Sequence, residues 1–249
     1  MRLIKSTVKT FFSVILELIY PERGICFICD KYDETLDEGH ICKSCRKTLP
    51  FIKEHRCKIC GKPLELGYIP DKCPDCIKNR HYFEKAVSPL LYKDIVKDYI
   101  YKYKYGKKSY MYKAFAPLMV NELVKNNLTD FDLIVPVPLH RSKMRKRGFN
   151  QSELLARLIS KKLDIPLDIK NLKRVKKTLT QNKLKRDERY KNVKNAFSIK
   201  KKGVFNNKRI LLVDDIFTTG STVDECSKTL LKAGGKEVFV VTIAVVDHY

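Results

Sequence analysis

The chain has 249 residues, enough for one sizeable α/β domain and a small appended module, and its 44% hydrophobic content supports a folded core. Ten glycines and ten prolines exclude a low-complexity chain. The formal net charge is +23, and residues 140–202 contain 22 Lys and Arg against 5 Asp and Glu. Such a concentrated excess is typical of a surface that faces phosphates. A generally lysine-rich proteome is the alternative explanation.

Residues 1–21 have the pattern of a short amphipathic helix that ends at Pro21. Its apolar stretch, Phe11–Tyr20, is too short to span a bilayer, and no secretory cleavage site is visible. The helix could pack against the rest of the protein or, through Lys5 and Lys9, make a weak contact with a membrane surface. We therefore expect a cytoplasmic protein without a transmembrane segment, which could lie at the inner face of the membrane.

Eight of the nine cysteines lie in residues 22–80, which we predict to form a separate module. They form two frames of identical C-x2-C-x12-C-x2-C spacing: Cys26, Cys29, Cys42 and Cys45, then Cys57, Cys60, Cys73 and Cys76. Two C-x-x-C turns supply four thiolates in the tetrahedral arrangement that zinc accepts. The frames predict two zinc ions, with an iron–sulfur cluster and redox disulfides as alternatives. Because each frame is complete in itself, sequential pairing is favoured over cross-braced pairing.

Apolar strands alternate with helices in residues 81–249, the predicted second domain. Strands are predicted at 86–92, 132–138, 208–213 and 237–246, and helices at 93–105, 110–125, 151–163 and 222–233. The strands are almost continuously apolar, as expected for strands buried on both faces. The alternation predicts an α/β fold with a mostly parallel, Rossmann-like sheet. The polar, basic segment 176–203 and the basic segment after residue 138 are expected to be loops.

The most specific motif is ILLVDDIFTTGST, which begins at Ile210. It predicts a buried strand that ends in Asp214 and Asp215, at the edge where α/β sheets bind ligands. The turn that follows, Thr218, Thr219, Gly220, Ser221 and Thr222, offers backbone amides, hydroxyls and a helix N-terminus to a phosphate. Two carboxylates beside this turn suit sugar hydroxyls, so the motif indicates a ribose 5-phosphate site. A metal-binding acid pair, as in a response-regulator sheet, is the alternative.

This motif resembles the phosphoribosyl pyrophosphate (PRPP) motif of type I phosphoribosyltransferases, although Phe217 stands where that pattern usually has an aliphatic residue. The chain from Pro21 onward also resembles the ComF family of competence proteins. Besides the cysteine frames, the matching segments are Lys104–Gly106, Val135–Arg141, Arg147–Glu153 and Gln181–Arg186. The resemblance implies a type I phosphoribosyltransferase fold with an N-terminal double zinc ribbon.

The resemblance also implies roles for individual residues. Asp214 and Asp215 would be the catalytic residues on the ribose hydroxyls, residues 218–222 would bind the 5-phosphate, and Mg²⁺ would accompany PRPP. In such folds the loop after the first strand of the domain contacts pyrophosphate. The corresponding loop of this chain offers four candidate donors: His140, Arg141, Lys143 and Arg147. The basic segment 176–203 could close over the site.

Two functions follow from the resemblance and the residues. The first is a PRPP-binding protein of natural transformation that binds single-stranded DNA on its basic surface and works with other DNA-uptake proteins. In its favour, tyrosines alternate with lysines in Tyr99–Tyr105 and could stack on bases, although a helix face packed on the core is the alternative. The second is an active phosphoribosyltransferase acting on an unidentified base in metabolism or salvage. Because no acceptor pocket is visible in the sequence, catalysis is left open.

Overall fold

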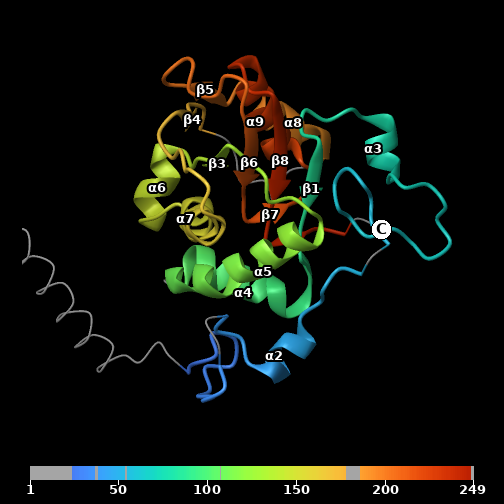
Figure 1. Ribbon diagram of the computed structural model, residues 1–249, viewed down its shortest axis with the longest axis vertical. Helices are drawn as coiled ribbons and strands as arrows, with labels where there is room; N and C mark the ends of the chain where they lie inside the picture. The colour runs from blue at the N-terminus through green and yellow to red at the C-terminus, as the bar shows by residue number, and fades with distance from the viewer. Residues whose placement is uncertain (1–23, 37–38, 54, 107, 178–185, 248–249) are drawn as a thin grey trace, which may run out of the picture. The chain divides into compact units, whose positions relative to one another are not determined.

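The computed structural model describes residues 24–247, apart from 37–38, 54, 107 and 178–185 (Figure 1). The predicted N-terminal helix of residues 1–21 therefore lies outside the described residues. The chain divides into two compact units, residues 1–48 and 49–249. This boundary falls between the two cysteine frames, so the predicted module of residues 22–80 is divided between the units. Among the helices that the structure describes, none has the length and apolar character needed to cross a bilayer.

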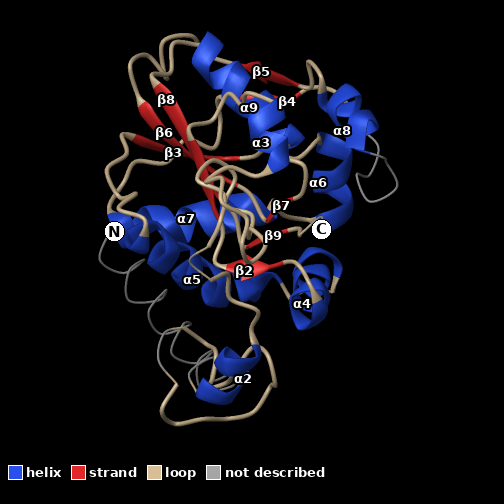
Figure 2. Cartoon of the chain, turned by 90° about the vertical axis from the view of Figure 1, so that its right-hand side faces the viewer, coloured by secondary structure: helices blue, strands red, loops and turns tan. Residues whose placement is uncertain are grey.

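A four-stranded parallel sheet forms the centre of the larger unit, in the order β1 (Lys85–Val87), β8 (Glu237–Val241), β6 (Arg209–Val213) and β3 (Leu133–Pro136). Every residue of β3, and every residue of β6 and β8 after the first, is buried. Strands buried on both faces need helices on both sides. Figure 2 shows α5 and α7 on one side of these strands and α8 and α9 on the other. The predicted parallel α/β fold is confirmed.

Most predicted helices appear with small shifts at their ends. The helices are α4 (Asp94–Tyr105), α5 (Tyr112–Lys125), α7 (Gln151–Leu163) and α9 (Ser221–Lys232), and a 3-10 turn, η1 (Ser109–Met111), precedes α5. The helix α7 has the predicted bounds because Asn150 caps it, accepting a hydrogen bond from the Ser152 amide, and Asp164 ends it in a left-handed conformation.

Two predicted strands are each divided between two sheets. The predicted strand 86–92 becomes β1 and β2 (Leu90–Leu91), and the predicted strand 237–246 becomes β8 and β9 (Ala244–Val245). A second parallel sheet contains β2, β9 and β7 (Ile216–Phe217). Since β7 follows β6 after only two residues, the second sheet places residues 216–217 directly beyond the carboxyl end of the main sheet.

Both segments predicted as loops contain regular structure. The segment after residue 138 forms α6 (Arg141–Arg147), because the His140 side chain caps it by accepting from the Ser142 amide and Gly148 ends it at φ +84°. Segment 176–203 contains α8 (Arg186–Val193) and β5 (Phe197–Ile199), which pairs antiparallel with β4 (Leu172–Arg174). The helix α8 packs against α9, and among its described side chains only Val193 is buried. A helix with so narrow a buried face has little apolar periodicity in its sequence.

Candidate active site and zinc centres

A pocket of about 160 Å³ lies at the carboxyl end of β6 in the larger unit. Its walls come from α4, α6, β4 and the turn between β6 and α9. This is the edge of a parallel sheet at which α/β proteins bind ligands. The pocket contains both acids of the sequence motif, Asp214 and Asp215, and their assignment to a ligand stays a prediction.

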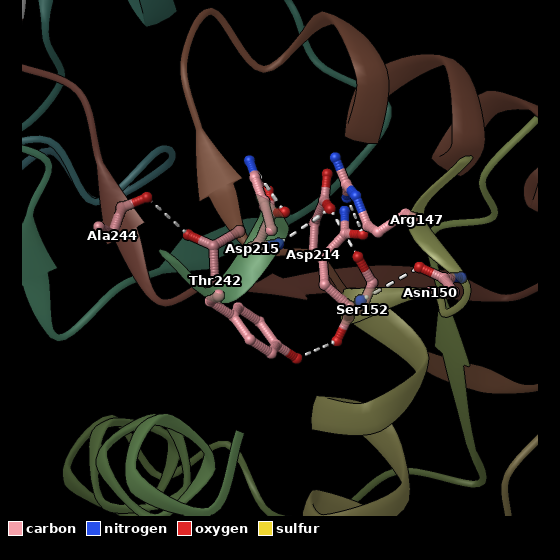
Figure 3. Close-up of polar contacts among 10 residues, drawn as sticks. Arg147, Asn150, Ser152, Asp214, Asp215, Thr242 and Ala244 are labelled. Carbon is pink, nitrogen blue, oxygen red and sulfur yellow. Dashed lines mark hydrogen bonds and ion pairs between the residues drawn. The ribbon is translucent and has the colours of Figure 1, made fainter. Parts of the chain in front are cut away.

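The acid pair is held at the base of this pocket. Asp214 Oδ1 accepts hydrogen bonds from Ser152 Oγ and from the Asp215 amide, each at 2.9 Å (Figure 3). Asp215 Oδ2 forms an ion pair with Lys104 Nζ at 3.0 Å. Burial and the neighbouring Asp215 charge raise the pKa of Asp214 to about 7, against the opposing hydrogen bonds and Lys104. Asp214 therefore changes its protonation state near neutral pH, and a hydrogen-bond donor that enters the pocket would favour its ionised form.

The turn after the acids has two kinds of residue. Thr218, Gly220 and Thr222 line the pocket, whereas the hydroxyls of Thr219 and Ser221 are buried and bond to each other at 2.8 Å. Gly220 adopts φ +78°, and a Cβ there would lie 2.7 Å from Phe217 Cζ. Two constraints therefore favour glycine at this position: the left-handed backbone conformation and the lack of space for a Cβ. The turn ends at the N-terminus of α9, where backbone amides suit a phosphate.

Four basic side chains converge on the same pocket: Lys104, Lys143, Arg147 and Arg174. Burial, together with the charges of Arg174, Arg147 and Lys104, lowers the pKa of Lys143. A multiply charged anion bound here would relieve this repulsion.

The predicted pyrophosphate donors are only partly brought together. Lys143 and Arg147 line the pocket, but His140 and Arg141 are not among the described residues that do so. His140 Nδ1 instead faces Ser142, whose amide lies 3.2 Å away and whose hydroxyl lies 2.8 Å away. Sequence reasoning assigned no role to Lys104, although it lies in a segment noted for the resemblance, and it missed Arg174 entirely.

Each cysteine frame brings its four sulfurs within 4.8 Å of one another. The Sγ atoms of Cys29 and Cys42 are 3.9 Å apart, and those of Cys60 and Cys73 are 3.6 Å apart. A tetrahedron with Zn–S bonds of about 2.3 Å has edges of about 3.8 Å, so both frames fit a zinc ion. The sulfurs group sequentially, as each complete frame predicted.

The second frame is also part of the core of the larger unit. Cys57, Cys60 and Cys73 belong to the same buried cluster as β6 and β8. The amide of Ala86 in β1 donates to the Ile59 carbonyl at 2.7 Å, and Arg56 pairs with the buried Glu122 of α5. This second zinc ribbon is therefore built into the unit that holds the pocket.

Comparisons with known proteins agree with this arrangement. Residues 15–77 match the double zinc ribbon domain, and residues 150–248 match the phosphoribosyl transferase domain. Competence protein F of Haemophilus influenzae is 34% identical over 215 residues, covering 80% of this chain and 94% of that protein. The chain belongs to the ComF family of competence proteins. This ComF family member thus combines a double zinc ribbon with a phosphoribosyltransferase fold.

Other relatives of this ComF protein cover similar lengths. DNA utilization protein YhgH of Escherichia coli is 30% identical over 221 residues, covering 87% of this chain and 95% of the relative. Competence protein ComFC of Bacillus subtilis is 27% identical over 227 residues, covering 84% and 90%. Among solved structures, a purine phosphoribosyltransferase from Pyrococcus horikoshii is 19% identical, covering 55% of this chain and 73% of that chain, with a TM-score of 0.34.

Proposed function

We propose that this ComF family member binds PRPP in the pocket at the end of β6 and acts in DNA uptake during natural transformation. The observation that carries the proposal is the buried acid pair, oriented by Ser152 and Lys104, beside a glycine turn and a cluster of cations. The names of the relatives from Haemophilus influenzae, Escherichia coli and Bacillus subtilis support a role in competence or DNA utilization.

Each part of PRPP has a matching part of the pocket. Asp214 and Asp215 would accept the two neighbouring ribose hydroxyls, and the turn at Gly220 would take the 5-phosphate on backbone amides. Lys143 and Arg147, with Arg174, would neutralise the pyrophosphate. Mg²⁺ prefers substrate phosphates and one or two carboxylates, so it would enter with PRPP, close to the acid pair. If the C1′–O bond breaks, the same cations would stabilise the departing pyrophosphate.

Calorimetric titration with Mg–PRPP tests this proposal directly. The double change Asp214→Ala and Asp215→Ala should abolish PRPP binding, whereas Asp130→Ala, whose side chain is 97% exposed, should leave it unchanged. Equal PRPP affinity of the double variant and the natural chain would contradict the proposal.

The pH dependence of PRPP binding tests the role of Asp214 separately. Its pKa of about 7 means that the ionised form of Asp214, which accepts hydrogen bonds from hydroxyl groups, is lost as the pH falls. PRPP affinity should therefore drop by about tenfold for each pH unit below about 7. Inorganic pyrophosphate is the control ligand, because it lacks the ribose but its phosphate groups also change protonation state with pH. An identical pH profile for both ligands would exclude Asp214 as the acceptor.

Single-stranded DNA is proposed to bind on the basic surface of residues 140–202. Exposed side chains there include Lys161, Lys173, Lys176 and Lys191. Because phosphate contacts release counterions, the affinity for a single-stranded oligonucleotide should fall steeply with salt. Changing these four lysines to glutamate should weaken DNA binding and leave Mg–PRPP binding intact. DNA affinity that does not respond to the four changes would place the DNA site elsewhere.

An active phosphoribosyltransferase is the second candidate function, since the aromatic residues Tyr92, Tyr101 and Tyr105 line the same pocket as the acid pair. Release of pyrophosphate from Mg–PRPP on addition of a candidate base would support it.

A further inference from the structure

The tyrosine–lysine tract of α4 has two faces with different surroundings. Tyr99 and Tyr103 are buried, and the Tyr103 hydroxyl donates to the Gln151 carbonyl at 2.7 Å. Tyr101 and Tyr105 are 64% and 53% exposed, and both line the PRPP pocket. The two interpretations of this tract therefore apply to different tyrosines: one pair packs into the core, and the other pair presents aromatic surface to the pocket.

The exposed pair lies next to the proposed ribose site. Lys104, which contacts Asp215 at 3.0 Å, stands three residues after Tyr101, and Tyr105 stands four residues after Tyr101, so each is a neighbour of Tyr101 on the helix surface. The Tyr101 and Tyr105 rings have centroids 5.2 Å apart and are tilted by 48°, so they do not stack on each other. The Arg147 guanidinium lies over the Tyr105 ring at 4.8 Å.

We propose that Tyr101 and Tyr105 form a nucleobase-stacking subsite at the mouth of the PRPP pocket, occupied by a base of single-stranded DNA. This inference rests on the proposed function. Half-exposed aromatic rings lose water-exposed apolar surface when a planar base covers them. Stacking on tyrosine tolerates any base, because every base presents a π-face. The cations of the pocket and the basic residues of 140–202 favour a base attached to a phosphate chain over a neutral free base.

The subsite also indicates where an acceptor of the phosphoribosyl group would lie in the pocket. A base on these tyrosines would lie on the same side of the pocket as the Lys104–Asp215 ion pair, and therefore near the ribose of bound PRPP. Bound DNA and bound PRPP would then share one pocket, and each should change the affinity of the protein for the other by the same factor.

The test compares two single-stranded 12-mers with equal numbers of phosphates, oligothymidine and its abasic analogue, by calorimetry at fixed salt. The natural chain should bind oligothymidine more tightly than the abasic strand by about tenfold. The change Tyr101→Leu should remove most of this difference, and Tyr101→Phe, which keeps the ring, should retain it. Equal affinity of the natural chain for both strands would overturn the proposal.

Further variants separate stacking from other effects. Tyr105→Phe should behave as the natural chain, whereas Tyr105→Leu should lose the preference for bases. Tyr82→Leu is the matched control, since Tyr82 is 44% exposed and has Lys228 over its ring at 5.3 Å, but is not among the described residues that line the pocket. A loss of base preference in Tyr82→Leu equal to that in Tyr101→Leu would contradict this site.

Two additional titrations answer separate questions. The first tells whether the stacked base belongs to DNA or to a small molecule, and the second tells whether a failure concerns the PRPP site or the stacking subsite. Free adenine should bind at least about tenfold more weakly than oligothymidine, because it lacks the phosphates. Tighter binding of adenine would overturn the assignment to DNA in favour of a small-molecule acceptor. Mg–PRPP titrated into the natural chain tests the PRPP site separately from the stacking subsite. If the natural chain fails to bind Mg–PRPP but prefers oligothymidine, the proposed PRPP function fails and the stacking subsite stands.

Discussion

The two cysteine frames fold in the same way locally. In the first, the Cys26 amide donates to the Lys31 carbonyl at 2.9 Å, and in the second the Cys57 amide donates to the Lys62 carbonyl at 2.7 Å. A short helix follows the third cysteine of each frame, α2 (Lys43–Thr48) and α3 (Pro74–Lys78). Identical spacing therefore gives one metal-binding architecture twice.

The frames differ in what surrounds them. The residue after the second cysteine has a left-handed backbone in both, at φ +56° for Asp30 and φ +69° for Gly61. Asp30 is exposed, whereas a Cβ on Gly61 would lie 2.6 Å from the Ala86 carbonyl oxygen of β1. Asparagine and aspartate tolerate this conformation, so only the neighbouring strand makes glycine necessary. The comparison shows that the second cysteine frame is part of the fold of the larger unit, while the first frame belongs to a unit of its own.

Removal of each zinc should produce the largest contrast. The change Cys73→Ser with Cys76→Ser should abolish both cooperative unfolding of the larger unit and PRPP binding, because a structural zinc contributes on the order of 10 kcal/mol to folding. The change Cys42→Ser with Cys45→Ser should remove one zinc and leave PRPP affinity within about twofold, since the first frame belongs to a separate compact unit that does not contain the pocket residues. Metal analysis, thermal unfolding and calorimetry measure these effects. Equal loss of PRPP binding in both variants would refute the claim that only the second frame supports the unit that holds the pocket.

The glycine of the second frame should give the next largest effect. Gly61→Ala should lower the free energy of unfolding of the larger unit by about 3 kcal/mol, since it combines left-handed strain with a clash against backbone. Gly67→Ala is the control, because Gly67 has φ +86° but a Cβ added there would meet no described atom within 4 Å. It should cost only the strain, about 1 kcal/mol. Denaturant unfolding measures both, and similar costs would mean that Ala86 yields to the added methyl group.

The smallest effect concerns the contact between the segment that follows the second ribbon and β7, the strand that precedes the turn of residues 218–222. Phe83, which follows the ribbon, meets Phe217 edge to face, with centroids 5.9 Å apart. Phe83→Leu should weaken PRPP binding by about threefold to tenfold, the range of one aromatic pair. Phe131→Leu is the control, because Phe131 forms a similar pair with Phe239, at 5.5 Å, outside the described pocket lining. An equal change in PRPP affinity in both variants would show a general loss of stability instead.

The sequence by itself determined the features that depend on local spacing. The cysteine frames and the central apolar strands are each encoded in one continuous segment, and the structure gathers the four sulfurs of each frame and builds a parallel sheet from the strands. Asp214, Asp215 and the turn after them likewise line one pocket. The caps of α7 belong to the same class, since Asn150 and Asp164 adjoin the helix that they limit.

Only the tertiary structure decided which distant side chains meet. Arg174 lies in β4, which pairs with β5, and α8 packs on α9. Neither feature has a clear local signal. The tract in α4 likewise gives no indication of which tyrosines face the pocket until the Lys104–Asp215 ion pair orients the helix. The physical reason is that these contacts join residues far apart in the chain, and the order of the strands in the sheet, which brings them together, is not encoded in any short segment.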